Sequence, residues 1–198
     1  MTIPTTRRGM LVLAAIAATA VAITAVAFAR PGRPAGPAFP SLNPAAAPAS
    51  WRHLALPNGA AVLSYPPALR PITGDKDAVS AARLSPGGTF QLYLNATPRQ
   101  GAETLAHWAA FRLKFLRADN AADAHLDAAA QGIRFRGGTG SCVIDRYITH
   151  IGGHHFQEIA CLVRGHTSAS VIVAAAPAAT WAQARPLLLR AVAAYLVH

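Results

Sequence analysis

An uncharged stretch near the N-terminus constrains this chain more than any other feature. Between Gly9 and Ala29 there is no charged side chain. About 20 helical residues, each rising about 1.5 Å, span a hydrocarbon core of about 30 Å, so this stretch is long enough to cross a membrane. A core helix of a cytosolic protein fits less well, because such a helix normally shows a polar face to water. The sequence therefore predicts an N-terminal transmembrane or signal helix over residues 1–29.

Two kinds of export element fit this segment. A cleaved signal peptide has a basic start, supplied here by Arg7 and Arg8, and a small-x-small cleavage motif, supplied by residues 27–29. The apolar run is longer than the usual signal core of about 7–15 residues, which favours a retained anchor. Residues 6–11 also resemble a twin-arginine signal, so the export route stays open. Both interpretations place the folded domain outside the cytoplasm of a bacterial-type cell, at the membrane or, if the chain is cleaved after Ala29, secreted.

A proline-rich segment separates this helix from the rest of the chain. Residues 30–50 contain six prolines and two glycines and show no amphipathic period. Such a composition is typical of an extended tether, which at about 3.1 Å per residue reaches about 65 Å. The sequence therefore divides into an export helix (1–29), a tether (30–50) and one domain (51–198).

The domain sequence is rich in predicted strands. Residues 51–56 and 60–64 flank Pro57-Asn58-Gly59, where Asn-Gly favours the positive φ angles of a tight hairpin. Residues 89–96 alternate, with Phe90, Leu92 and Leu94 on one face. The other predicted strands are residues 78–84, 132–136, 141–150, 155–164 and 168–175, and an alanine-rich connection is expected before residue 132.

Two segments change to a helical period. In residues 101–117 the apolar side chains recur at three and four positions, while Arg112 is expected to point away from them. Residues 180–183 resemble a capping box that would start a C-terminal helix ending at Leu196, with Pro186 kinking it or delaying its start. The apolar residues of the first helix are Leu105, Trp108, Phe111 and Phe115, and Trp108 and Trp181 are expected to be core anchors.

Strands without regular intervening helices predict an α+β fold, an antiparallel β-sheet packed by two amphipathic helices. The Asn58-Gly59 hairpin followed by Ser64-Tyr65-Pro66, together with residues 168–175 leading to Trp181 and the last helix, resembles the PsbP/Mog1-like fold. The resemblance implies a noncatalytic binding or assembly module. It carries over no partner-specific residues.

The chain has two cysteines, Cys142 and Cys161. Each lies in a predicted strand of one hairpin around residues 151–153, and pairs of positions that sum to 303 would place the two opposite each other. We predict a disulfide, which presupposes an oxidising compartment. Two buried thiols are the alternative.

Histidines gather near the tip of the same hairpin, with Asp145 further along its first strand. Zinc or copper would need three or four converging ligands, whereas adjacent strand residues point to opposite faces. Exposed turn histidines are therefore favoured, and no metal site or cofactor is predicted. The candidates for the metal alternative are His150, His154, His155 and His166.

Catalytic motifs are absent from the sequence, since residues 138–142 match neither a nucleophile elbow nor a phosphate-binding loop. The domain carries 14 basic and 8 acidic residues, a net charge of +6, without a nucleic-acid recognition motif. An envelope protein, an anionic polymer or lipid head groups are the expected partners. The sequence thus predicts an extracytoplasmic binding or assembly module. The alternative is a small envelope hydrolase or metal-dependent enzyme that uses residues 150–166.

Overall fold

The computed structural model describes residues 39, 42–118 and 121–198. The predicted export helix of residues 1–29 lies outside these residues. Of the helices in the described ranges, none combines the length and the apolar character needed to cross a bilayer.

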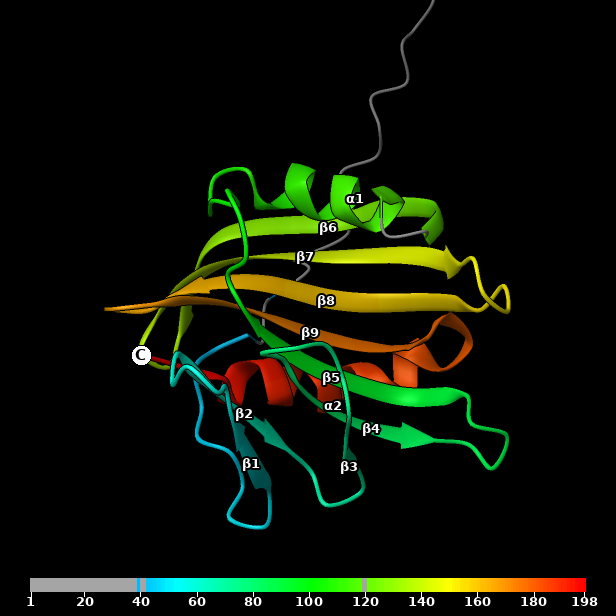
Figure 1. The fold of residues 1–198 in the computed structure, drawn as a ribbon, viewed down its shortest axis with the longest axis horizontal. Coiled ribbons are helices and arrows are strands. Elements are labelled where there is room, and N and C mark those ends of the chain that lie inside the picture. Colours follow the sequence, from blue (N-terminus) through cyan, green and yellow to red (C-terminus); the bar gives the residue numbers. More distant parts are fainter. Residues whose placement is uncertain (1–38, 40–41, 119–120) are drawn as a thin grey trace, which may run out of the picture. The chain divides into compact units, whose positions relative to one another are not determined.

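A seven-stranded antiparallel sheet forms the centre of the domain, in the order β3-β4-β5-β9-β8-β7-β6 (Figure 1). A second antiparallel sheet has the order β1-β2-β10. Two α-helices, α1 and α2, complete the domain, so the predicted α+β class with two helices on an antiparallel sheet is confirmed. The elements are β1 (Arg52–Ala55), β2 (Ala61–Tyr65), β3 (Arg70–Ile72), β4 (Val79–Leu84), β5 (Phe90–Pro98), α1 (Trp108–Ala118), β6 (Ala121–Phe135), β7 (Gly138–Thr149), β8 (His155–Arg164), β9 (Ala169–Pro177), a 3-10 turn (Ala178–Thr180), α2 (Trp181–Ala194) and β10 (Leu196–Val197).

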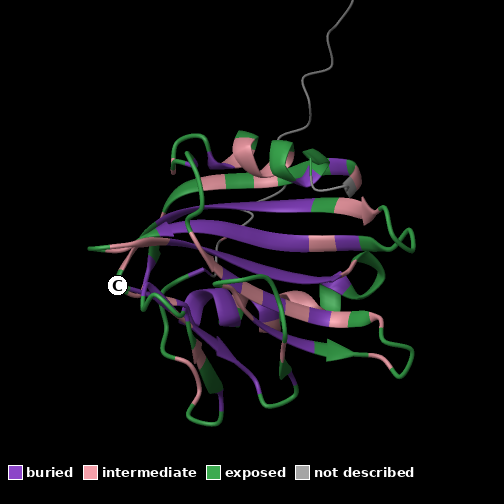
Figure 2. Ribbon diagram, in the orientation of Figure 1, coloured by how far each residue is buried: buried purple, intermediate pink, exposed green. Residues whose placement is uncertain are grey.

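The two helices cover opposite faces of the large sheet. Along β8, Ile159, Cys161 and Val163 belong to the core shared with α2 and the small sheet, while Ala160 and Leu162 pack with Trp108 of α1. This alternation follows from the strand period of two. The central strands β8 and β9 are almost continuously buried (Figure 2).

The predicted hairpin of residues 51–64 is confirmed, with one difference at its turn. Gly59 has a φ of +72°, whereas Asn58 does not have a positive φ. Asn58 instead accepts a hydrogen bond from the backbone amide of Ala60 through its side-chain oxygen, at 3.0 Å. Glycine therefore supplies the left-handed conformation, and asparagine closes the turn through its side chain.

The expected connection before residue 132 is wrong, because these residues belong to the 15-residue strand β6. Its pairing with β7 shifts register at three places. Alanine favours strands weakly, and bulges disrupt the alternation by which a strand is recognised. An edge strand of this composition therefore gives little strand signal in the sequence.

Both helices have bounds other than those predicted. α1 begins at Trp108 rather than at residue 101, after a turn in which Thr104 accepts hydrogen bonds from the amide of His107. Thr180 does precede α2, but its hydroxyl donates to the carbonyl oxygen of Pro177 and caps no helix amide. α2 runs through Pro186 and ends at Ala194, because the residues that follow pair with β2.

The described part of the expected tether lies against the domain. Leu42 is 6% exposed and belongs to the core on the α2 side, and Phe39 packs against the same core. The amide of Ala45 donates to the carbonyl of Ala193 at 3.0 Å. The structure differs here from an unfolded spacer, so any free tether is shorter than residues 30–50.

Candidate functional site

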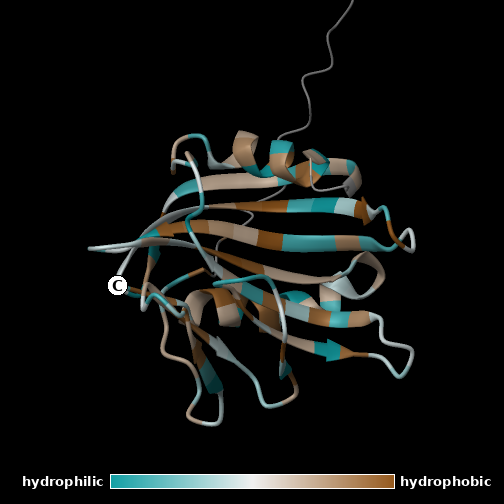
Figure 3. Cartoon of the chain, in the orientation of Figure 1, coloured by the Kyte–Doolittle hydropathy of each residue, from teal (hydrophilic) through white to brown (hydrophobic). Residues whose placement is uncertain are grey.

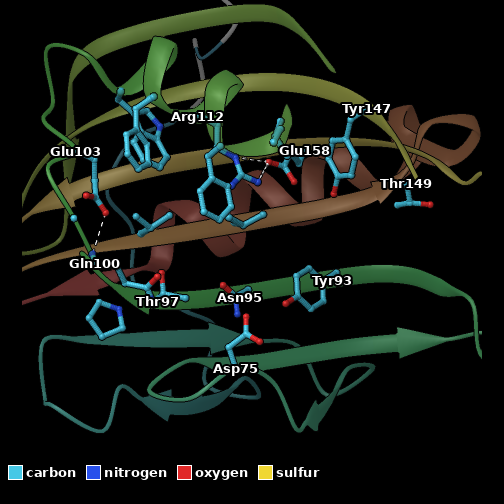
Figure 4. A pocket seen from close by; sticks show the side chains of 18 of the residues that line it. Asp75, Tyr93, Asn95, Thr97, Gln100, Glu103, Arg112, Tyr147, Thr149 and Glu158 are labelled. Carbon is cyan, nitrogen blue, oxygen red and sulfur yellow. Dashed lines mark hydrogen bonds and ion pairs between the residues drawn. The ribbon is translucent and has the colours of Figure 1, made fainter. Parts of the chain in front are cut away.

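α1 leaves part of its face of the large sheet uncovered. The helix lies over β6 and β7, and the sheet continues past β8 into β9 and β5 (Figure 1). An open groove of about 630 Å³ follows the helix over these two strands (Figure 4). This volume lies within the range of about 300–1,000 Å³ typical of small-molecule sites.

The floor of the groove comes from the second face of β5. Leu92, Leu94 and Ala96 point into the core on the α2 side. The residues between them therefore face the groove, and Tyr93 and Asn95 line it together with Thr97. Asn95 donates from its side-chain amide to the Ser80 hydroxyl at 2.9 Å, which fixes its orientation. The floor thus presents a phenol, an amide and a hydroxyl in a row.

Hydrophobic side chains complete the floor and form the wall. Val171 and Val173 of β9 continue the floor, and Phe111 and Phe115 of α1 line the groove beside them. Trp108 is 2% exposed and donates from its indole nitrogen to the carbonyl of Ala160 at 2.9 Å, which holds α1 on β8. The groove therefore has an apolar wall on one side of a polar strand.

A buried charged cluster lies where α1 meets β7 and β8. Arg112 binds Glu158 through two guanidinium nitrogens, the Nε at 2.9 Å, and its Nε lies 3.9 Å from a carboxylate oxygen of Asp145. Asp145 and Glu158 are each 1% exposed and face each other directly across the two strands. Figure 3 shows hydrophilic positions interrupting the apolar colour of β7 and β8 towards their hairpin.

One guanidinium cannot neutralise two buried carboxylates. Burial raises the pKa of Asp145 to about 9, and repulsion from Glu158 adds to the effect, while Arg112 opposes it. Asp145 is therefore protonated at neutral pH, and the cluster consists of an Arg112–Glu158 ion pair beside a neutral acid. Burial also raises the pKa of the nearby Tyr147 phenol, so that group stays protonated.

The prediction that Arg112 points away from the buried face of its helix is wrong. Residues four apart share a helix face, and Trp108, Arg112 and Leu116 form the row that meets the sheet. Phe115, expected in that row, is 42% exposed. A charged side chain can occupy the inner row because Glu158 on β8 pairs with it.

The predicted disulfide between Cys142 and Cys161 is confirmed. The two residues are directly opposite in the β7–β8 ladder, at the expected register sum, with Cα atoms 4.1 Å apart. They belong to the core on the α2 side, away from the groove. The disulfide therefore lies in the core and does not line the groove.

The histidine candidates do not come together. All four are exposed, and of these only His150 lines the groove. Within the described ranges, no group of three or more histidine, cysteine, aspartate or glutamate side chains is placed to hold a metal. The four candidates are His150, His154, His155 and His166.

The groove was missed by sequence reasoning, although two signals were present. The register sum of 303 that pairs the cysteines also pairs Asp145 with Glu158, and each of these acids interrupts an apolar strand. The polar residues Tyr93, Asn95 and Thr97 also alternate with apolar ones along β5. Which helix would face them could not be read from the spacing.

Comparison with known proteins supports a fold but no family. No protein-family model matches the chain, and neither does any curated protein. The solution structure of the cyanobacterial PsbP protein CyanoP from Synechocystis is similar, with a TM-score of 0.55 at 12% identity, over 77% of this chain and 95% of that one. The predicted resemblance to the PsbP-like fold is thereby confirmed at the level of fold.

Two further solved structures match with lower TM-scores. A crystal structure from Bacteroides thetaiotaomicron has a TM-score of 0.45 at 11% identity, over 75% of this chain and 49% of that one. LpqN from Mycobacterium tuberculosis, described as involved in cell envelope biogenesis, has a TM-score of 0.37 at 14% identity, over 76% of this chain and 79% of that one.

Proposed function

We propose that this chain is an extracytoplasmic binding module, tethered to the membrane or secreted, whose ligand occupies the groove beside α1. The observation that carries the proposal is the uncovered part of the sheet face, where a polar strand and an apolar helix wall border an open groove of about 630 Å³. A concave site with an apolar wall and a few convergent polar groups is the usual form of a ligand site.

The location outside the cytoplasm is supported by the disulfide. Stable disulfides form in oxidising compartments, and the Cys142–Cys161 bond is buried in the core rather than exposed as a redox-active pair would be. The uncharged run between Gly9 and Ala29 supplies the export element in this proposal.

Binding is favoured over the hydrolase alternative by the composition of the groove. An enzyme using residues 150–166 would need a pocket that collects at least two of the histidines with Asp145. His150 lines the groove alone among them, and Asp145 does not line it. The buried Arg112–Glu158 pair has the position of a structural support for the wall.

The proposal is tested by photocrosslinking in intact cells that make the protein. Phe115, 42% exposed on the rim, is replaced by benzoyl-phenylalanine, and Leu84, 46% exposed on the β4–β5 hairpin outside the groove, serves as the control position. We expect discrete adducts from position 115 alone, and we expect a groove-filling Thr97→Trp substitution to reduce them. Adducts that form equally from both positions, or that Thr97→Trp leaves unchanged, would contradict a ligand in the groove.

A further inference from the structure

Charge is distributed unevenly between the groove and the rest of the domain. Three of the chain's eight acidic residues line the groove: Asp75, Glu103 and Glu158. Of the lysines and arginines that the structure describes, Arg112 alone lines it. The groove is therefore acidic within a chain whose formal net charge is +10.

Arg112 does not neutralise the groove as a whole, because Glu158 already binds it. Asp75 and Glu103 form no ion pair with any residue in the described part of the chain. Two carboxylates thus keep their charge available to a ligand.

Glu103 gives the most specific indication of the kind of ligand that the groove binds. The residue is 4% exposed, and one carboxylate oxygen accepts a hydrogen bond from the backbone amide of Gln100 at 3.0 Å. Its second oxygen, Oε2, is buried and has no hydrogen-bond partner among the described residues. A buried carboxylate oxygen without a donor is costly, so a donor group arriving in the groove would satisfy it.

The centre of the groove experiences the same negative field. Burial raises the pKa of the Tyr93 phenol, and the charges of Asp75 and Glu158 raise it further. Asp75 comes from the loop after β3, and Figure 4 shows its carboxylate directed towards the polar strand from the side opposite Glu158. A field that opposes a phenolate favours a cation at the same place.

We propose that the groove binds an organic cation, in which an ammonium group meets Glu103 and an apolar body lies on Val171, Val173 and the α1 wall. The inference rests on the proposed function, because it names the ligand class of that same groove. The carboxylates supply the charge complementarity, and Phe111 and Phe115 supply the apolar and aromatic contact.

The test compares three probes that share an apolar body and differ in charge. The full chain in a nonionic detergent is titrated with phenethylamine, 2-phenylethanol and 3-phenylpropanoate, and backbone amide shifts are followed by NMR. We expect phenethylamine to bind at least about tenfold more tightly than the other two, with shifts along β5 and β9. The isosteric Glu103→Gln substitution should abolish most of this preference, because it removes the charge and keeps an acceptor for the Gln100 amide.

A matched control removes a carboxylate elsewhere. Asp123 is exposed on β6 outside the groove and has a φ of +52°, a conformation that asparagine tolerates, so Asp123→Asn should leave the preference unchanged. The proposal of a cationic ligand would be overturned if the alcohol or the carboxylate bound as tightly as the amine or more tightly. It would also be overturned if the preference for the amine survived Glu103→Gln. If none of the probes binds the groove, the cation is likewise overturned, whereas the crosslinks from position 115 still test the binding module by themselves.

Discussion

The two faces of the seven-stranded sheet come from the same strands yet differ in what covers them. On the α2 side, Ile159 and Cys161 of β8 lie in a continuous apolar core. On the α1 side the same strand carries Glu158, and the covering helix contributes Arg112 and leaves β5 uncovered. Because side chains alternate along a strand, one sheet combines a dry core on one face with a charged, half-open surface on the other. In our proposal, the α2 face provides the continuous apolar core and the α1 face binds the ligand beside a buried ion pair.

The largest effect is expected where charge is buried on the α1 face. Arg112→Met leaves Glu158 buried without its partner, and breaking such a pair costs about 3–5 kcal/mol of unfolding free energy. Urea unfolding followed by circular dichroism measures the loss. The double variant Arg112→Met with Glu158→Gln should recover much of it, since the uncompensated charge is gone. A single variant as stable as the wild type would show that this face depends on packing alone.

A matched pair of truncations compares the faces directly. Leu188 of α2 is 1% exposed, so Leu188→Ala should cost about 2–5 kcal/mol through the cavity it leaves. Truncating Phe115 on the groove rim removes more atoms than truncating Leu188. Phe115→Ala should nevertheless cost less than about 1 kcal/mol of unfolding free energy, because the ring is 42% exposed. Thermal unfolding of both variants checks the ranking. Equal losses would mean that the groove wall belongs to the core.

The disulfide provides a change confined to the α2 face. Replacing both Cys142 and Cys161 by alanine removes a crosslink over a sequence separation of 19 residues and should cost about 3 kcal/mol by the chain-entropy model. Guanidinium unfolding measures this loss, and adding a reductant should destabilise the wild type but not the variant. Amine binding in the groove should persist in the folded variant, and its disappearance would couple the faces that we describe as separate.

Much of the fold was accessible from the sequence where local patterns agree with burial. The register sum placed Cys142 opposite Cys161 correctly, because one hairpin turn fixes every pair along its two strands. β6 was missed because its bulged, alanine-rich sequence has neither strong strand propensity nor a clean alternation.

The site was less accessible, because it depends on how elements meet. The apolar spacing of residues 101–117 predicted a helix but not which of its residues face the sheet. The energy of burying Arg112 depends on Glu158, 46 positions later in the sequence. Helical periodicity locates the buried face by its apolar residues, so it assigns a charged residue that is buried in an ion pair to the exposed face. The groove itself exists because α1 lies over β6 and β7 and leaves β5 uncovered, and no local pattern encodes which strands a helix will cover.

A pH-dependent effect separates the neutral acid from the ion pair on the α1 face. The pKa of Asp145 is raised to about 9 in the folded state, so the folded protein holds a proton that the unfolded chain releases above about pH 4. Wild-type stability should therefore fall relative to Asp145→Asn as the pH rises from about 4 to about 9, and the difference should become constant above that.

Each pH unit between the two pKa values costs the wild type about 1.4 kcal/mol, so between pH 4 and pH 8 we expect Asp145→Asn to gain several kcal/mol of stability relative to the wild type. The asparagine does not ionise and keeps a neutral donor beside Glu158. Unfolding curves at pH 4, 6, 8 and 9.5 measure the difference. Asp77→Asn is the control, since Asp77 is exposed outside the cluster and its φ of +65° is a conformation that asparagine tolerates. A wild-type advantage that grows with pH would mean that Asp145 is ionised in the folded protein and that Arg112 serves both carboxylates, and the α1 face would then bury a second negative charge instead of a neutral acid.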